Sequence, residues 1–274
     1  MSPTVTPRPD PVRIKPVPGR RHRLRRWVRN AALALGVAAP LVFLLAAILY
    51  KVGLSSLGFS LGFLTTQLGV WLLAAAIVAG LASLALGVFI KPRSSGAIGT
   101  GALAAGVGLA GLLWLGSVRA TGERLPAIHD ITTDTQNPPE FRGRILAERE
   151  GANPLGYVGK RLDPDDPGSE LVSVLQARSY PDINPIVTGR EPADAQARAR
   201  AVADDLGWVV KDEEPGRIEA TDTTFWYGFE DDVVIRIRPG SGGGSVVDLR
   251  SVSRVGRSDL GANAARIREF AETF

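Results

Sequence analysis

Three long runs of uncharged residues dominate the first 120 positions of the chain, at residues 31–50, 68–90 and 96–118. An α-helix rises about 1.5 Å per residue, so roughly 20 apolar residues cross the ~30 Å hydrocarbon layer of a bilayer. The pattern predicts three transmembrane helices within residues 31–118, because a soluble core would not need three such runs. The first run is longer than the apolar part of a signal peptide, so we expect it to stay as a span.

The pattern changes after residue 119, where shorter elements with turn residues between them replace the long runs. Helical spacing and alternating strand-like spacing follow one another, and the strand-like runs are joined by short links. Short links favour an antiparallel meander of four strands with helices covering one face, which is an α+β fold. The predicted helices are residues 168–180, 191–206 and 260–274, and the predicted strands are residues 208–211, 217–229, 233–238 and 246–255.

Charge is divided unevenly between these two regions. Residues 1–118 hold 12 of the 32 basic residues and a single acid, Asp10, whereas residues 119–274 hold the other 20 basic residues and 27 acids. The sequence pI near 9.7 therefore reflects the N-terminal region, and we expect no nucleic-acid partner. The basic run could also act as a lipid-binding or nucleic-acid-binding arm. The absence of cysteine excludes disulfides and thiolate chemistry.

Basic flanks predict how the spans are oriented. Arginines are dense before the first run and Lys91 and Arg93 join the second and third runs, whereas residues 51–67 carry only Lys51. The positive-inside rule then places residues 1–30 in the cytoplasm as a disordered basic tail, and residues 119–274 on the periplasmic or extracellular side of the inner membrane. We expect the apolar loop 51–67 to lie along the outer membrane surface.

Four arginines are expected to crowd on one face of the predicted sheet. Side chains alternate along a strand, so the apolar positions of residues 233–238 and 246–255 face the helices while the arginines face the other way. Two interpretations remain open: a solvated face laced with ion pairs, or a groove that grips an anionic group through bidentate guanidinium contacts. The arginines are Arg236, Arg238, Arg250 and Arg254, and the expected counter-ions are Glu219 and Asp248.

Four segments of this region resemble one uncharacterised family, domain of unknown function 1499 (DUF-1499). They are "IHDITTDTQNPPEF", "SYPDINPI", "GRIEATDTTFWYGFEDDVVIRIRP" and "VDLRSVSRVGRSDLGANAARIREF", and the resemblance extends over about residues 120–274. The three-span N-terminal part looks like a membrane-attached bacterial version. The resemblance brings no activity with it, and implies only a recurring pattern of polar residues: Asp130, Asp134, Asp222, Arg250, Ser253, Arg254, Arg257, Asp259 and Asn263.

Familiar catalytic motifs do not occur in the sequence: there is no Gly-x-Ser-x-Gly elbow, no His-Glu-x-x-His helix and no P-loop. The segment "HDITTD" offers Asp130 and Asp134 as weak candidates for a hard-cation site, although a structural role in an irregular loop is favoured. "GSGGGS" precedes a strand and is expected to be a hairpin loop. The aromatic run 225–229 is expected to contribute to the core, with a lipid-facing or ligand-stacking use as the alternative.

These features favour a membrane-anchored envelope protein that needs no cofactor and binds an anionic ligand or an acidic partner. Phospholipid headgroups are the ligand that we expect first, because they lie close to the folded region. The lipid bilayer itself is an expected partner of the spans. One alternative is a hydrolase or isomerase that uses Asp130, Asp134 or Asp222 beside an arginine clamp. Another is a scaffold for a second membrane protein. The predicted binding residues are Asp222, Arg236, Arg238, Arg250, Ser253, Arg254 and Arg257.

Overall fold

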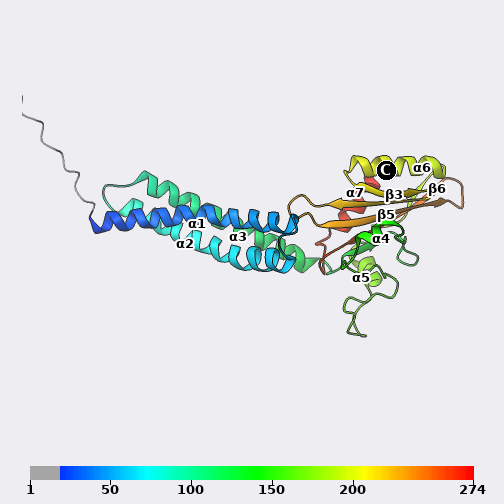
Figure 1. The fold of residues 1–274 in the computed structure, drawn as a ribbon, viewed down its shortest axis with the longest axis horizontal. Helices are drawn as coiled ribbons and strands as arrows, with labels where there is room; N and C mark the ends of the chain where they lie inside the picture. Colours follow the sequence, from blue (N-terminus) through cyan, green and yellow to red (C-terminus); the bar gives the residue numbers. More distant parts are fainter. Residues whose placement is uncertain (1–18) are drawn as a thin grey trace, which may run out of the picture. The chain divides into compact units, whose positions relative to one another are not determined.

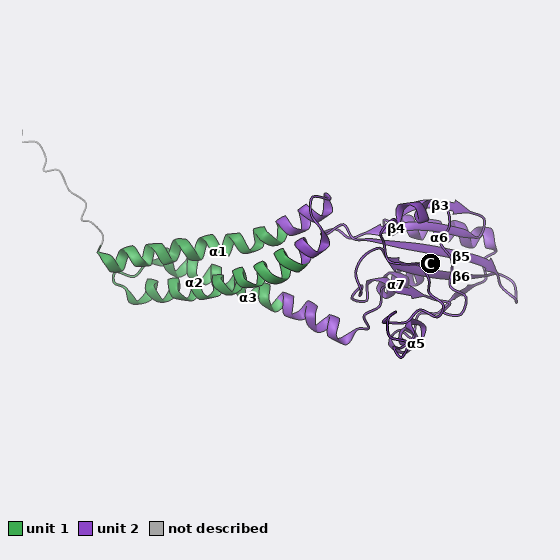
Figure 2. Ribbon diagram, turned by 60° about the horizontal axis from the view of Figure 1, so that its bottom comes forward, with its two compact units in different colours: residues 1–44, 62–113 green, residues 45–61, 114–274 purple. Residues whose placement is uncertain are grey.

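The computed structural model describes residues 19–274 and divides the chain into two compact units (Figures 1 and 2). The helical unit contains residues 62–113 and the described residues up to 44, and the folded unit contains residues 45–61 and 114–274. Part of the expected tail, residues 1–18, lies outside the described residues. The prediction of disorder is wrong for residues 20–30, because the first helix already begins at Arg20.

Three helices are long and apolar enough to cross a membrane, as the hydrophobic runs predicted. They are α1 (Arg20–Lys51), a π-helical segment η1 (Gly58–Gly69) that continues into α2 (Val70–Phe89), and α3 (Ser95–Arg124). The second helix is longer than expected. Most of the loop predicted to lie along the membrane surface belongs instead to η1, whose residues are as uncharged as those of the span that follows.

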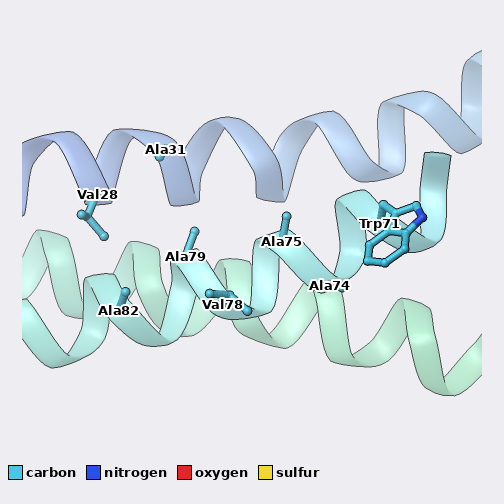
Figure 3. Close-up of a pocket in the computed structure, with 8 residues that line it drawn as sticks. All are labelled: Val28, Ala31, Trp71, Ala74, Ala75, Val78, Ala79 and Ala82. Carbon is cyan, nitrogen blue, oxygen red and sulfur yellow. The ribbon is translucent and has the colours of Figure 1, made fainter.

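Small residues let α2 and α3 approach closely. A Cβ added at Gly80 would lie 2.6 Å from the backbone nitrogen of Ala105, and one added at Gly101 would lie 2.5 Å from the carbonyl oxygen of Gly80. Close contact between backbones favours helix association in lipid, where the hydrophobic effect contributes little to holding helices together. Between α1 and α2 the packing is looser, and Val28 and Trp71 help to line an apolar groove of about 510 Å³ (Figure 3).

The folded unit is built on a sheet in which four consecutive strands form the predicted antiparallel meander. They are β3 (Val209–Glu214), β4 (Arg217–Thr223), β5 (Glu230–Pro239) and β6 (Ser245–Ser253). In the central pair, Val234 lies opposite Arg250 and Arg236 lies opposite Asp248. This register confirms that the apolar positions of β5 and β6 share one face and the arginines share the other.

The sheet has six strands and not four. The additional strands are β1 (Asp130–Thr132) and β2 (Ile186–Thr188), which both pair antiparallel with β6 at opposite ends of it. Each has only three residues, too few for alternation to be visible in the sequence. Their pairing satisfies backbone groups of β6 that would otherwise form an unprotected edge.

The helices expected on one face of the sheet are present as α6 (Pro192–Asp205) and α7 (Ala262–Thr273). Pro192 occupies the first turn of α6, and Gly207 follows that helix with a φ of 77°, a left-handed conformation that favours glycine. Under these helices lies the main core, with fully buried members such as Ile235, Leu249 and Phe270. We call this side of the sheet the helix face.

The opposite side, which we call the loop face, was expected to be open and is covered. Residues 133–160, including the short helix α4 (Arg144–Glu148), lie over it, and Figure 1 shows α4 and α6 on opposite sides of the sheet. Phe141 and Ile145 of this segment pack on Val234 and Val252 in a second small core. The segment escaped prediction because proline, asparagine and short polar side chains hide its few apolar contacts. The remaining helix of the unit, α5 (Val172–Ser179), ends before Pro181 as predicted.

Candidate functional site

Arg236 and Arg238 share one buried carboxylate on the loop face. Arg236 donates to Oδ2 of Asp248 from Nε at 3.1 Å and from Nη2 at 3.0 Å, and Arg238 Nε donates to the same oxygen at 2.8 Å. Asp134 Oδ2 accepts from Arg236 Nη2 at 3.1 Å. Asp248 is thus confirmed as a counter-ion, and two guanidinium groups are balanced by two carboxylates. Only the Arg238 side chain is substantially exposed, at 45%.

Arg250 lies deep in the loop face and is fully engaged. Its Nε and Nη2 donate to the two oxygens of Asp130, each at 2.9 Å, and it also donates to the backbone oxygen of Leu155 at 2.5 Å. The rings of Phe141 and Tyr157 lie 5.7 and 5.6 Å from its guanidinium carbon. Since Arg250 is 3% exposed, the expectation that it crowds on an open face is wrong.

Arg254 is held in a similar bidentate pair at the other end of the same face. Its Nε and Nη2 each donate to Asp232 at 2.8 Å, and Nη1 donates to Glu230 at 2.6 Å. Asp232 is fully buried and also accepts from Arg149 Nη1 at 2.6 Å. Hydrogen bonding to Asp232 raises the pKa of Arg254, so this guanidinium stays charged beside its carboxylate.

Glu219, the other expected counter-ion, serves an arginine that was not predicted. Its Oε1 accepts from Arg217 Nη1 and, at 2.5 Å, from the backbone nitrogen of Arg142. Its Oε2 is buried without a hydrogen-bond partner among the described residues. Burial raises the pKa of Glu219 above its usual range.

Ser253 and Asp222 belong to a polar cluster beneath α7. Ser253 Oγ accepts from Asn263 Nδ2 at 2.9 Å, and Asp222 Oδ2 accepts from Arg266 Nε at 2.8 Å. Arg266 also donates to Asp231 at 2.7 Å and is buried. These contacts fix α7 to the ends of the strands, which gives both predicted residues a structural role.

His129 and Lys160 form a polar contact at the edge of the loop face. His129 Nδ1 lies 3.2 Å from the backbone oxygen of Arg257, which can only accept, so Nε2 accepts from Lys160 Nζ at 3.2 Å. Lys160 Nζ also lies 3.7 Å from Asp130 Oδ2. Burial lowers the pKa of His129 and of Lys160, because both charged forms lose hydration there.

The weak candidates for a metal site, Asp130 and Asp134, are engaged by different arginines. Asp130 accepts from Arg250, whereas Asp134 accepts from Arg236 and, through Oδ1, from the backbone nitrogen of Asn137 at 2.9 Å. Within residues 19–274 no group of three or more histidine, aspartate or glutamate side chains could hold a metal ion. The two carboxylates act as counter-ions and loop-fixing groups in this arrangement.

The ends of α1 and α3 contact one end of the folded unit, which we call the anchor end. Lys51 Nζ donates to the backbone oxygen of Phe225 at 2.8 Å. A Cβ added at Gly122 would lie 3.1 Å from Leu260 Cδ2, so the last turns of α3 pass close to the loop before α7. The anchor end therefore consists of residues 50–51, 122–125, 224–229 and 254–261.

Three cations of the anchor end, Lys51, Arg124 and Arg257, make no ion pair with any described residue, and all three are exposed. Glu123, which is adjacent to Arg124 in the sequence, pairs with Arg119 at 2.8 Å. Asp259, two residues after Arg257, accepts from the backbone nitrogens of Gly261 and Asn263. Arg257 uses only its backbone oxygen, toward His129. It is the one predicted binding residue whose charged group is exposed and unpaired among the described residues.

Several residues that organise the charged clusters were missed from the sequence. Arg149 and Lys160 lie in irregular segments and Arg217 is the first residue of β4, and nothing in their local sequence distinguishes them. Arg266 carried a readable signal, because it follows Asn263 by three residues and therefore lies on the same side of the helix. The surplus of acids within residues 119–274 indicated that pairing partners would be available for the arginines.

Comparison with known proteins agrees with the resemblance seen in the sequence. The model of the family described as "Protein of unknown function (DUF1499)" matches residues 130–274, just over half of the chain. No curated protein matches the chain. The matched region contains the whole sheet, both of its faces and all seven predicted binding residues. The chain therefore belongs to the DUF1499 family.

Proposed function

We propose that this chain is an envelope protein of the inner membrane whose folded domain binds anionic phospholipid headgroups through Lys51, Arg124 and Arg257. The basic flanks of the spans support an N-terminus in the cytoplasm and a folded domain on the periplasmic or extracellular side. The anchor end then faces the headgroups of the outer leaflet. The arginines of β5 and β6 serve mainly to hold the domain together.

One contrast carries this proposal. Arg236, Arg250 and Arg254 each contact a buried carboxylate, whereas the three cations of the anchor end have no acidic partner within the described chain. A paired, buried guanidinium has little left to offer a ligand, because its donors are used and its charge is cancelled. An exposed cation beside the end of a membrane span has its charge available, and Lys51 uses only one of its donors, toward the backbone oxygen of Phe225.

The expected free energy of attraction between each cation and anionic lipid is modest, and the contributions of the three side chains add up. A basic side chain close to an anionic membrane surface contributes about 1 kcal/mol, and the attraction decays over a Debye length of about 8 Å at physiological salt. Anchoring by the spans keeps the cations at the surface permanently, so even this weak attraction selects among lipids. The selection favours anionic headgroups over zwitterionic ones.

The alternative of a hydrolase or isomerase has less geometric support. Asp130 and Asp222 accept hydrogen bonds from guanidinium groups, and Asp134 accepts from a guanidinium and from backbone nitrogens. A general base needs a free lone pair directed at its substrate. The same pairing argument applies to an acidic protein partner on the loop face, which would have to displace carboxylates already in place.

The test measures lipid selectivity around the full chain in vesicles. Spin-labelled phosphatidylglycerol and spin-labelled phosphatidylcholine are compared by electron paramagnetic resonance, which resolves the lipids immobilised at the protein. We expect the wild type to prefer the anionic lipid, and expect the variant Lys51→Ser, Arg124→Ser, Arg257→Ser to lose most of the preference that the outer leaflet contributes. High salt should weaken the preference of the wild type and change that of the variant less.

A matched control variant, Arg142→Ser, Arg178→Ser, Arg190→Ser, removes the same net charge from exposed positions outside the anchor end. It should keep the selectivity of the wild type. Equal losses in the two variants would reduce the effect to net charge and refute the assigned surface. Unchanged selectivity in the anchor-end variant would refute the proposal outright.

A further inference from the structure

The turn between β4 and β5 carries two aromatic side chains that the folded domain leaves uncovered. Phe225 is 78% exposed and Trp226 is 65% exposed. The other exposed side chains from residue 125 onward that are large and apolar are all aliphatic, whereas Phe141, Tyr157, Tyr180, Trp208 and Phe270 are buried. Burying two neighbouring aromatic rings would stabilise the fold by several kcal/mol, by the relation between buried apolar area and free energy. The exposed rings of the turn do not contribute this stabilisation.

The turn is a defined structure and not a loose loop. The backbone nitrogen of Thr224 donates to the oxygen of Phe229 at 2.9 Å, and Gly228 donates back to Thr224 at 3.0 Å. Thr224 Oγ1 also accepts from the nitrogen of Phe229 at 2.8 Å. These bonds hold Phe225 and Trp226 at the tip, edge to face with their ring centres 5.3 Å apart.

The same turn is fastened to the end of α1. Tyr227 and Phe229 stack on each other, and the ring of Tyr50 lies 6.1 Å from the first and 5.4 Å from the second. Lys51 Nζ lies 5.4 Å from the centre of the Phe225 ring and donates to its backbone oxygen. The inner aromatic pair thus packs on the helix, and the outer pair, Phe225 and Trp226, stays exposed.

The depth of this helix end follows from its length. The apolar run of α1 before Lys51, residues 31–50, has 20 residues, which at about 1.5 Å per residue matches the ~30 Å hydrocarbon layer. Tyr50 and Lys51 therefore reach the boundary between hydrocarbon and headgroups, where tyrosine and the ends of lysine side chains commonly lie. Val52 and Leu54, which follow directly, are 59% and 75% exposed.

We propose that the β4–β5 turn inserts Phe225 and Trp226 into the interfacial layer of the bilayer at the end of α1. The occupant of this apolar surface is lipid, because the surface continues from a helix that itself crosses the membrane. Indole and phenyl rings are stable at this depth, where the apolar ring is shielded and the indole nitrogen still reaches water. The turn then fixes the height of the folded domain above the membrane.

This inference shares with the proposed function the anchoring by the spans and one residue, Lys51, which also contacts the turn. Headgroup selection by Lys51, Arg124 and Arg257 depends on lipid charge, whereas insertion of aromatic rings does not. Either one can fail while the other holds. The two are separated by measuring insertion in vesicles of phosphatidylcholine alone and in vesicles that also contain phosphatidylglycerol.

The chain contains no cysteine, so a single nitroxide label can be placed without removing native residues. The variant Trp226→Cys carries the label at the tip, and Val187→Cys carries it at a position in β2 that is 78% exposed, the same fraction as Phe225. Power saturation of the full chain in vesicles compares collisions with oxygen, which concentrates in lipid, and with a water-soluble nickel chelate. We expect a several-fold lower nickel accessibility at position 226 than at 187, with high oxygen accessibility, in both lipid mixtures.

Equal nickel accessibility at the two positions would place the tip in water and overturn the proposal. Low accessibility to both reagents would also overturn it, because it would mean that protein covers the tip. Protection that disappears when the lipid-to-protein ratio is raised would assign the surface to a second copy of the chain. Quenching by brominated lipids, compared between the wild type and Trp226→Phe, repeats the measurement without any label at the tip and must agree.

Discussion

The two faces of β5 and β6 are both buried, but by opposite kinds of chemistry. On the helix face, Ile235 and Leu249 pack under α6 and α7 in an apolar core. On the loop face, one residue further along each strand, Arg236 and Arg250 pair with carboxylates under residues 133–160. Alternation along the strand produces both faces from a single stretch of sequence.

The difference teaches that a row of arginines on a strand does not by itself indicate a ligand site. Burying a charge is costly unless an opposite charge and hydrogen bonds accompany it. The loop face meets this requirement with Asp130, Asp232 and Asp248, which are fully or almost fully buried. Removing one charge should therefore disturb the loop face at least as much as a cavity disturbs the helix face.

The largest loss of stability is expected from Asp232→Ala, which removes the carboxylate that Arg149 and Arg254 share. Leaving a buried charge unpaired costs about 3–5 kcal/mol in the free energy of unfolding. Unfolding of the full chain in detergent, followed by near-ultraviolet circular dichroism, measures the loss. On the helix face, Leu249→Ala provides the comparison, with an expected loss of about 2–5 kcal/mol.

The control for this comparison is Glu170→Ala, which breaks an exposed pair with Arg178. Exposed pairs contribute about 0–1 kcal/mol. If Asp232→Ala cost no more than Glu170→Ala, the loop face would be solvated like an ordinary surface, and its contrast with the helix face would disappear.

A smaller loss in the free energy of unfolding is expected when both partners of a buried ion pair are replaced together than when one is replaced alone. Arg250→Met or Asp130→Leu alone leaves one charge buried and should destabilise the chain strongly. The double variant removes both charges and should be more stable than either single variant, because apolar side chains of similar size can replace a buried pair. A double variant as unstable as the sum of the two single variants would show that the residues do not interact.

The smallest expected change in stability depends on pH and arises from His129, at the edge of the loop face. The pKa of His129 is lowered from its ordinary 6.5, chiefly by burial, so the folded state binds fewer protons than the unfolded state near that pH. The stability from this group is therefore present above pH 6.5 and is lost as the pH falls through the folded pKa. The wild type should lose more stability than His129→Gln between pH 7.5 and pH 5.5, and parallel curves would contradict the assignment.

The fold was largely readable from the sequence where elements are long or strictly periodic. The three spans, the meander and α6 follow from hydrophobic spacing, and the register of β5 and β6 confirms the predicted division of their faces. The strands β1 and β2 and the helix α4 were missed, because three to five residues show too little periodicity. Without them the loop face was taken to be open.

The candidate site was less predictable, because pairing depends on contacts distant in sequence. Asp130 and Arg250 are separated by 120 positions, and Asp134 and Arg236 by 102. Asp248 was identifiable as a partner only because its strand neighbours Arg236 in a hairpin. Arg257 belongs to the motif quoted for the family, but its exposure depends on the end of β6 and the path of the following loop.

The most direct test follows individual arginine side chains by nuclear magnetic resonance. The full chain, labelled with nitrogen-15 at arginine, is placed in nanodiscs of phosphatidylcholine, and phosphatidylglycerol is then included. We predict that the Nε–H signals of Arg250 and Arg254 exchange slowly with water and keep their positions, while the signal of Arg257 exchanges quickly and shifts with the anionic lipid. If Arg250 and Arg254 shift while Arg257 does not, the assignment of buried pairs to the sheet and of lipid binding to the anchor end is wrong.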